Sequence, residues 1–178
     1  MPTSAEQGKA FARDVVLALD PPPQTVLDVG AGSGTWAALL RADLVPSSWT
    51  AVEIHEPYVA RFKLNDWYDN VVVGDVRLLV DDVDLAADLV ILGDVLEHMP
   101  ALDAVTLLRR LAPLARHLLV SLPVRVWEQG AVDGNEHEAH VHHWDDPSVR
   151  DVLLFGHDLI ASQVGPDVGV YLLRGGRP

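Results

Sequence analysis

A run of glycines marks one place where a ligand could approach the backbone. Residues 28–34 read Asp-Val-Gly-Ala-Gly-Ser-Gly, after a short apolar stretch and before helix-forming residues. Glycine lets the chain turn tightly and lets a ligand come close to backbone amides, because no β-carbon stands in the way. We therefore predict that this turn binds a ligand of nucleotide type.

Acidic residues follow the later apolar runs of the chain. Glu53 lies about 20 residues after the turn, where an acid accepts hydrogen bonds from the two hydroxyls of a ribose. Asp75 follows the third apolar run and Asp94 follows the fourth. The carboxyl ends of parallel strands form the ligand-binding edge of an open sheet, so we expect these three acids and the turn to face one site.

The elements that must position these residues follow from the apolar pattern. Continuous apolar runs at 25–29, 50–54, 70–73, 88–92 and 117–122 predict parallel strands that are covered on both faces. Helical segments at 35–41, 58–65, 76–80 and 102–111 separate them, which predicts a doubly wound α/β sheet. Two further runs, 158–164 and 168–173, flank the turn 165–167 and predict an antiparallel pair. An amphipathic helix over 4–19, with Ser4 as its N-cap, comes first, and Pro21 to Pro23 end it.

Two families place a glycine-rich turn between a strand and a helix. The G-x-G-x-x-G/A pattern of dinucleotide-binding proteins is satisfied by residues 32–37, so a nicotinamide-dinucleotide oxidoreductase is one alternative. Residues 28–34 also carry Asp-x-Gly-x-Gly-x-Gly without a gap, and in this the chain resembles S-adenosylmethionine-dependent methyltransferases. A carboxylate at Asp28 would repel a pyrophosphate, but it would attract the cationic amino end of a methyl donor.

The resemblance to these methyltransferases extends over residues 24–123. Residues 93–98, Gly-Asp-Val-Leu-Glu-His, resemble the D-x-L-E-H segment of many small-molecule and RNA ribose O-methyltransferases, and the Asn/Asp-Pro-Pro-Tyr/Phe sequence of base-amine methyltransferases is absent. The resemblance implies the class I methyltransferase fold, a Rossmann-like seven-stranded sheet that is mostly parallel and ends in an antiparallel hairpin. It also implies S-adenosylmethionine as the cofactor, S-adenosylhomocysteine as the product, and a set of donor-binding residues: Asp28, Gly30, Ala31, Gly32, Glu53, Ile54, Asp75, Val76, Gly93 and Asp94.

A histidine-rich segment follows the fifth predicted strand, with His137, His140, His142 and His143 close together. The segment resembles the corresponding loop of short bacterial and phage methyltransferases, in a pattern that this chain fills with Gly134, Asn135, Glu138, His140 and Trp144. In this interpretation the loop forms the wall of the acceptor site. Asp94 and His140 are then the candidates for the base, and Glu97 and His98 orient them.

Two other interpretations of the histidines stay open. Asp94, Glu97, His98 and one of His140, His142 or His143 could bind magnesium, manganese or zinc, as in metal-assisted ribose- or quinone-type O-methyltransferases, which use a Glu-x-x-Glu-His segment and a later histidine. Alternatively, the loop histidines are solvated and Glu97 and His98 only begin the next helix. We therefore commit to no metal ligand from the sequence.

Composition limits the remaining choices. The 178 residues suit one domain, divided into an N-terminal helix or lid (1–23), a donor-binding core (24–123), an acceptor loop (124–145) and a C-terminal helix and hairpin (146–178). A net charge of −13 disfavours nucleic acid as a partner. The sequence has no cysteine and no apolar run near the roughly 20 residues that span a bilayer, so we expect a cytoplasmic monomer or homodimer. The predicted function is methyl transfer to a small-molecule or glycan-type acceptor at oxygen or nitrogen.

Overall fold

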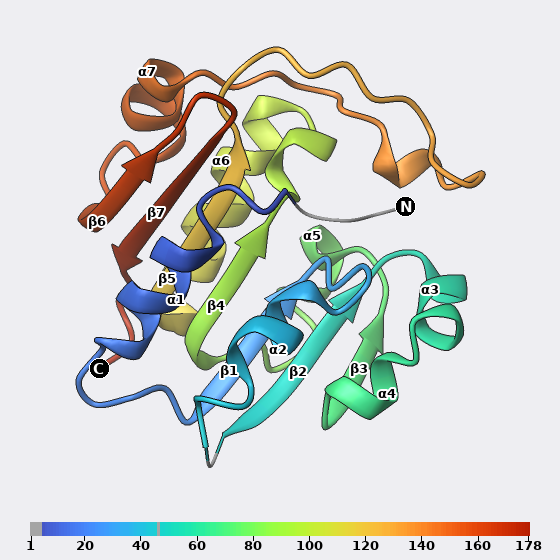
Figure 1. Ribbon diagram of the computed structural model, residues 1–178, viewed down its shortest axis with the longest axis vertical. Helices are drawn as coiled ribbons and strands as arrows, with labels where there is room; N and C mark the ends of the chain where they lie inside the picture. The colour runs from blue at the N-terminus through green and yellow to red at the C-terminus, as the bar shows by residue number, and fades with distance from the viewer. Residues whose placement is uncertain (1–4, 46) are drawn as a thin grey trace.

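The computed structural model describes residues 5–45 and 47–178, and its central element is a seven-stranded sheet (Figure 1). The strand order is β3-β2-β1-β4-β5-β7-β6. The strands are β1 (Thr25–Val29), β2 (Ser48–Glu53), β3 (Asn70–Val73), β4 (Ala87–Gly93), β5 (Ala115–Pro123), β6 (Asp158–Val164) and β7 (Val168–Arg174). β1 to β5 run parallel, whereas β7 is antiparallel to both β5 and β6. The predicted parallel sheet and its reversed C-terminal hairpin are confirmed.

Burial along the strands explains their composition. Every residue of β4, in the middle of the sheet, is buried, and its sequence Ala-Asp-Leu-Val-Ile-Leu-Gly is almost wholly apolar. β3 lies at one edge, and all four of its residues are at least partly exposed. A strand covered on both faces must be apolar throughout, which is why continuous apolar runs in the sequence predict the central strands.

The helices agree with most of the predicted segments. They are α1 (Lys9–Leu17), α2 (Thr35–Leu40), α3 (Glu56–Arg61), α4 (Leu64–Trp67), α5 (Val76–Leu79), α6 (Ala101–Leu111) and α7 (Asp146–Ser148), which continues into a π-helical segment, Val149–Leu153. The single helix predicted over 58–65 is wrong. The backbone of Lys63 is left-handed, with φ of 51°, so the chain turns between α3 and α4. The helix predicted over 4–19 begins only at Lys9, after the left-handed backbone of its N-cap Gly8, and the proposed N-cap, Ser4, lies outside the described residues.

Two layers of helices cover the two faces of the sheet (Figure 1). On one face, α1, α2 and α4 pack on a cluster that includes Val16, Trp36 and Trp49. On the other face, α6 and the π-helical segment pack on a cluster that includes Leu92, Leu108 and Leu153. The carboxyl ends of β1 to β5 are left facing the loops that follow them.

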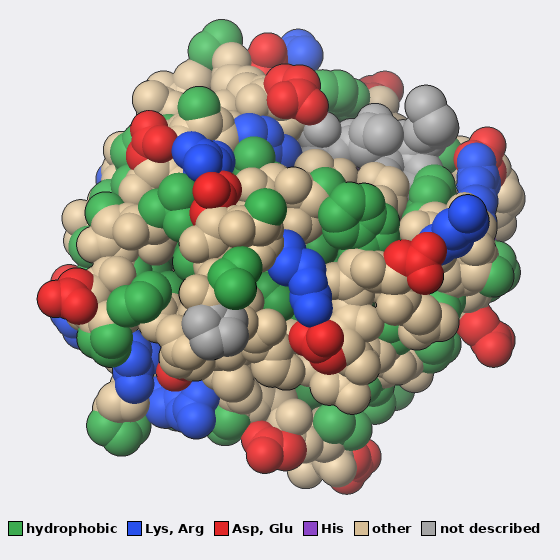
Figure 2. All heavy atoms as spheres, turned by 60° about the horizontal axis from the view of Figure 1, so that its bottom comes forward, with side chains coloured by type: hydrophobic (Ala, Val, Ile, Leu, Met, Phe, Trp, Pro, Cys, Tyr) green, Lys and Arg blue, Asp and Glu red, His purple; other side chains and the backbone are tan. Residues whose placement is uncertain are grey.

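Many of the surface arginines are paired with acidic residues. On the face in Figure 2, acidic and basic side chains lie interspersed, without a continuous basic patch. Ion pairs such as Arg13–Asp43 and Arg41–Asp69, each at 2.9 Å, hold many of the arginines. Among the described residues, no helix combines the length and the apolar composition that a membrane crossing requires.

Candidate active site

A cavity opens at the carboxyl ends of the parallel strands. The loops after β1, β2, β3 and β4 line it on one side, and residues of the segment after β5 line it on the other. The predicted donor-binding residues all contribute to its lining except Asp28. The predicted site residues Asp94, Glu97, His98 and His140 line it as well. The tertiary structure thus gathers, around one space, residues that the sequence distributes over five segments.

The glycine turn adopts a conformation that side chains resist. The φ angles of Gly30, Gly32 and Gly34 are 70°, 52° and 78°, in the left-handed region. A β-carbon on Gly30 would lie 2.5 Å from Cγ2 of Val95, so the turn also sits directly against the loop after β4. Both facts explain why this part of the motif must be glycine.

Glu53, the last residue of β2, connects the glycine turn to the neighbouring strand. Its two carboxylate oxygens accept hydrogen bonds from the backbone N–H groups of Gly32, at 2.9 Å, and His55, at 2.8 Å. Burial raises the pKa of Glu53, and these two backbone hydrogen bonds oppose the rise. Each oxygen retains a lone pair, so the carboxylate can still accept hydrogen bonds from a ligand in the cavity.

Asp28 lies beneath the glycine turn and does not line the cavity. Its carboxylate is fully buried and accepts a hydrogen bond from the hydroxyl group of Tyr68 at 2.5 Å. Burial raises the pKa of Asp28 to about 7, against the opposing effects of Tyr68 and Lys9. The expectation that Asp28 contacts a ligand is therefore not supported by its position, whereas an indirect role in ordering the turn agrees with it.

Asp75 is already engaged by a neighbouring arginine. Its carboxylate caps α5 by accepting a hydrogen bond from the backbone N–H of Arg77 at 2.9 Å, and it forms an ion pair with the Arg77 guanidinium at 2.6 Å. These interactions lower the pKa of Asp75 and keep it ionised. Arg77 also lines the cavity, although we did not single it out from the sequence. Its position two residues after the acid was the available signal.

Trp36 lines the cavity and Lys9 lies against its ring, and the sequence analysis identified neither residue. The indole ring of Trp36 lies against Gly93, because a β-carbon there would be 1.7 Å from Nε1 of the indole. The Nζ atom of Lys9 lies 3.5 Å from the Trp36 ring centroid, and Lys9 is buried. Lys9 shares a face of α1 with the buried residues Ala12 and Val16, and that spacing could have identified it as an inward-facing cation.

Asp94 directly follows β4 in a strained conformation. Its φ of 56° is uncommon for a residue other than glycine. Its backbone N–H donates to the carbonyl oxygen of Ser121 at 2.7 Å, which fixes the residue to β5. Such backbone strain is frequent in functional sites, and here it occurs at a residue that lines the cavity.

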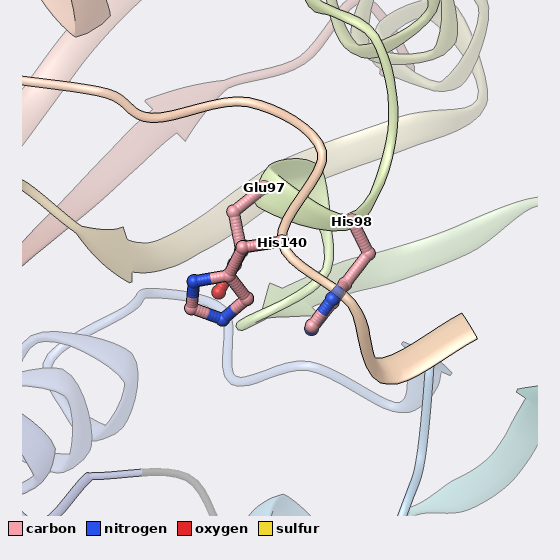
Figure 3. A group of neighbouring side chains, drawn as sticks. All are labelled: Glu97, His98 and His140. Carbon is pink, nitrogen blue, oxygen red and sulfur yellow. The ribbon is translucent and has the colours of Figure 1, made fainter. Parts of the chain in front are cut away.

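Glu97, His98 and His140 lie together in the lining of the cavity (Figure 3). Glu97 and His98 belong to a 3-10 turn, Leu96–His98, and His140 comes from the segment that crosses this turn. The ring centroids of the two histidines are 5.0 Å apart. Burial lowers the pKa of both histidines and raises that of Glu97 well above its ordinary value, with the nearby carboxylate of Asp94 adding to the rise.

Backbone hydrogen bonds hold the segment after β5 against this turn. The backbone N–H groups of Val141 and His142 donate to the carbonyl oxygen of Glu97, at 2.8 and 3.0 Å. The backbone N–H of His140 donates to the carbonyl oxygen of Gln129 at 2.9 Å. The position of His140 is therefore fixed by main-chain contacts.

Trp144 does not line the cavity, although the resemblance predicted that it shapes the acceptor site. It is 2% exposed and belongs to the core on the α6 face of the sheet. Its Nε1 donates to the carbonyl oxygen of Leu96 at 3.5 Å. The indole anchors the end of the loop, since a large apolar ring gains most when it is removed from water.

The other loop histidines differ in position. His137 lines the cavity, whereas His142 and His143 are not among its lining residues. His142 packs edge-on against Trp144, with ring centroids 4.5 Å apart, and His143 is exposed. The idea of a solvated histidine thus suits His143 and does not suit His140.

The arrangement combines a nucleotide-type cradle with acid–base groups in one cavity. The turn, Glu53 and Asp75 offer backbone amides and carboxylates. Asp94, Glu97, His98 and His140 offer proton acceptors and ligand atoms in the lining of the same cavity. A group carried by a bound nucleotide could be transferred to a second molecule held in this cavity.

One comparison with known proteins identifies a family. A family model described as "Methyltransferase domain" matches residues 4–155. No curated protein matches the sequence.

Solved structures share the fold at low sequence identity. The PH0226 protein from Pyrococcus horikoshii OT3 is similar with a TM-score of 0.70 and 15% identity, covering 95% of this chain and 89% of that one. A 1,6-didemethyltoxoflavin-N1-methyltransferase from Burkholderia thailandensis gives 0.69 and 22%, covering 96% and 79%. The N-terminal domain of EvdMO1, crystallised in the presence of S-adenosylhomocysteine and D-fucose, gives 0.65 and 16%, covering 97% and 84%.

Proposed function

The chain belongs to the methyltransferase domain family and is an S-adenosylmethionine-dependent methyltransferase, and we propose that it methylates a small, hydroxylated acceptor. The observation that carries this proposal is the shared cavity. The glycine turn, Glu53, Asp94 and His140 all line it. A donor nucleoside bound at the turn and Glu53 would hold its methyl group in the cavity that Asp94 and His140 also line.

The residues present fit the methyl donor. Glu53 has free lone pairs for the two ribose hydroxyls, and Ile54 and Val76 offer apolar contacts for an adenine ring. Asp75 is held ionised by Arg77 and can accept a hydrogen bond from the adenine amino group. S-adenosylmethionine supplies an electrophilic methyl carbon on a sulfonium, and the displacement is in line.

The segment after β5 lines the cavity with polar groups and one aromatic face. Gln129, Asn135, Glu138 and His140 line the cavity together with Trp127, which is 37% exposed. Hydrogen-bonding groups beside an exposed indole suit a hydroxylated ring more than a fully apolar one. The crystal of the EvdMO1 domain with D-fucose supports a sugar-like acceptor, and the toxoflavin N1-methyltransferase shows that a related fold also accepts a ring nitrogen. We therefore keep both oxygen and nitrogen as the methylated atom.

The chain's own residues would carry the proton. An acceptor hydroxyl that attacks the methyl carbon loses its proton, and Asp94 and His140 are the two groups placed to take it. The loop held by Val141 and His142 would cover the reacting atoms and limit the access of water. Glu97 and His98, which lie beside His140, would orient it.

Calorimetry and a labelled donor test the proposal. Purified protein should bind S-adenosylhomocysteine and should not bind NAD, since the glycine turn could in principle accept a dinucleotide. Incubation with radiolabelled S-adenosylmethionine and panels of sugars, polyols, phenols and nitrogen heterocycles should label a hydroxylated compound. Binding of NAD alone, or labelling confined to apolar acceptors, would contradict the proposal.

A further inference from the structure

We propose that Glu97, His98 and His140 form a binding site for a divalent transition-metal ion in the lining of the cavity. One ligand atom from each side chain lies within 4.8 Å of the other two. All three side chains converge on one region, two from the turn after β4 and one from the loop that crosses it (Figure 3). Two imidazoles and one carboxylate are a recurrent ligand set for such ions.

The tautomers of both histidines suit metal binding. Nδ1 of His98 lies 3.0 Å from the carbonyl oxygen of Ala139, and Nδ1 of His140 lies 2.5 Å from that of Trp127. A carbonyl oxygen only accepts, so each Nδ1 carries the proton and donates it. Each Nε2 is therefore left with its lone pair. A histidine ligand commonly has this arrangement, in which the other ring nitrogen donates to a carbonyl and fixes the ring.

The surroundings of the Glu97 carboxyl group independently indicate that it binds a cation. The residue is 1% exposed, and within the described part of the chain neither carboxylate oxygen has a hydrogen-bond partner. A buried carboxyl without a partner is destabilising, because it has lost its water and gained nothing in return. A cation bound between Glu97 and the two imidazoles would remove that penalty.

The surrounding charge also favours a cation. The side chains of Asp94 and Glu138 lie near enough to Glu97 to interact with it electrostatically, so three acidic side chains meet here. Lys9 faces Asp94 from α1, so it offsets part of this negative charge, although it lies over the ring of Trp36. A divalent ion would balance the rest where the three proposed ligands meet.

The types of ligand atom determine which metal ions the site should prefer. Imidazole suits zinc, cobalt and iron, whereas magnesium prefers oxygen ligands and retains its water. Ligand atoms about 2 Å from a shared ion lie roughly 3–4 Å apart, so binding should draw the three side chains somewhat closer. Three protein ligands leave coordination positions open toward the cavity.

The open positions give the ion a role that rests on the proposed function. An acceptor hydroxyl bound to the ion would lose its proton more readily, because a metal lowers the pKa of bound oxygen. With Nε2 of His140 engaged as a ligand, Asp94 would be the residue that takes the proton. The acceptor class narrows to compounds whose reacting oxygen can bind a metal, such as those with adjacent hydroxyl groups.

Titration of the metal-free protein with Zn²⁺, by calorimetry, and with Co²⁺, by visible absorption, tests the site. We expect one ion per chain in the wild type. Glu97→Gln and His140→Gln keep the approximate size of each side chain and should weaken Zn²⁺ binding by more than the roughly 10–100-fold that loss of an outer hydrogen-bonding partner costs. His143→Gln is the matched control, since His143 is exposed and outside the cluster, and it should bind as the wild type does.

Two further measurements distinguish loss of metal binding from loss of folding and from loss of donor binding. Circular dichroism and thermal unfolding show whether each variant folds, and if Glu97→Gln does not fold, the Co²⁺ spectra of His98→Gln and His140→Gln decide alone. Equal loss of Zn²⁺ affinity in His143→Gln, or no binding by the wild type, would overturn the site. S-adenosylhomocysteine binding is measured on the same samples. If it persists without metal binding, the metal site is refuted and the proposed function stands.

Discussion

The hydroxyl group of Tyr68, at the end of α4, donates a hydrogen bond to the buried carboxylate of Asp28 on β1. The two residues are 40 positions apart in the chain. Through this contact the carboxylate is fixed on the face of the sheet that α1, α2 and α4 cover. The acid that opens the glycine motif thus stabilises the support of the turn, and the contact makes the stability of the protein depend on pH.

The pH dependence of stability should contain a component from Asp28. Its pKa is about 7 in the folded protein and about 3.9 in an unfolded chain, so folding favours the protonated form. Its contribution is fully present below about pH 4 and is lost as the pH rises through about 7. Asp28→Asn should remove a slope of up to about 1.4 kcal/mol per pH unit from the free energy of unfolding. Urea unfolding at several pH values measures it.

Tyr68, Lys9 and Glu53 all act on this carboxyl, so the slope is shared among coupled groups. Asp66→Asn, at an exposed position of α4, is the control and should leave the slope unchanged. If Asp28→Asn and the wild type have parallel profiles between about pH 4 and 7, Asp28 is ionised throughout that range and our account is wrong.

Gly93→Ala should damage both folding and donor binding. The new methyl group would lie 1.7 Å from Nε1 of Trp36, so the indole must move within the cavity that it lines. Overpacking of this kind costs about 1–3 kcal/mol of stability. Thermal unfolding and calorimetry with S-adenosylhomocysteine report the two effects. Gly130→Ala adds the same group where nothing lies within 4 Å, and wild-type behaviour is expected there.

Glu53→Gln should weaken donor binding more than it weakens the fold. In the wild type, the backbone N–H groups of Gly32 and His55 each donate to one carboxylate oxygen of Glu53. In the glutamine variant, an amide nitrogen replaces one of these oxygens and cannot accept the hydrogen bond. Hydrogen bonds to charged groups contribute about 1.5–3 kcal/mol, which corresponds to roughly 10–100-fold in affinity for S-adenosylhomocysteine. Glu56→Gln, an exposed acid in the first turn of α3, provides the comparison. Equal affinities in both variants would remove Glu53 from the donor site.

Asp94→Asn should lower turnover while the donor still binds. The asparagine keeps the shape of the side chain but cannot accept a proton, and general-base catalysis typically contributes about 10²–10⁴-fold. Single-turnover transfer of a labelled methyl group to the identified acceptor measures the loss. If Asp94→Asn and His140→Gln both retain full turnover, neither residue is the base.

Trp144→Ala and Trp127→Ala should separate the two roles of the loop tryptophans. Trp144 is buried in the core, so its truncation should cost about 3–5 kcal/mol of stability. Trp127 lines the cavity at its exposed end, so its truncation should leave stability nearly unchanged and reduce kcat/KM for the acceptor. Chemical denaturation and steady-state kinetics distinguish them, and the reverse pattern would refute our placement of both rings.

Much of the fold could be predicted because local patterns determine it. The central strands are buried on both faces, and only continuous apolar runs satisfy that requirement. The glycine turn needs left-handed backbone angles, so its residue types are fixed wherever it occurs. The helix predicted over 58–65 failed because the left-handed backbone of Lys63 has no clear signature in the residue itself.

The sequence alone determined the fold class, the family and the residues that follow each strand, since each depends on neighbours in the chain. Tertiary structure decided which of those residues meet. It placed Asp28 under the turn with Tyr68, moved Trp144 into the core, and brought His140 to Glu97 and His98 through hydrogen bonds from Val141 and His142. Those contacts join segments about 40 residues apart, and no local pattern encodes the distance between side chains that only the packed chain brings together.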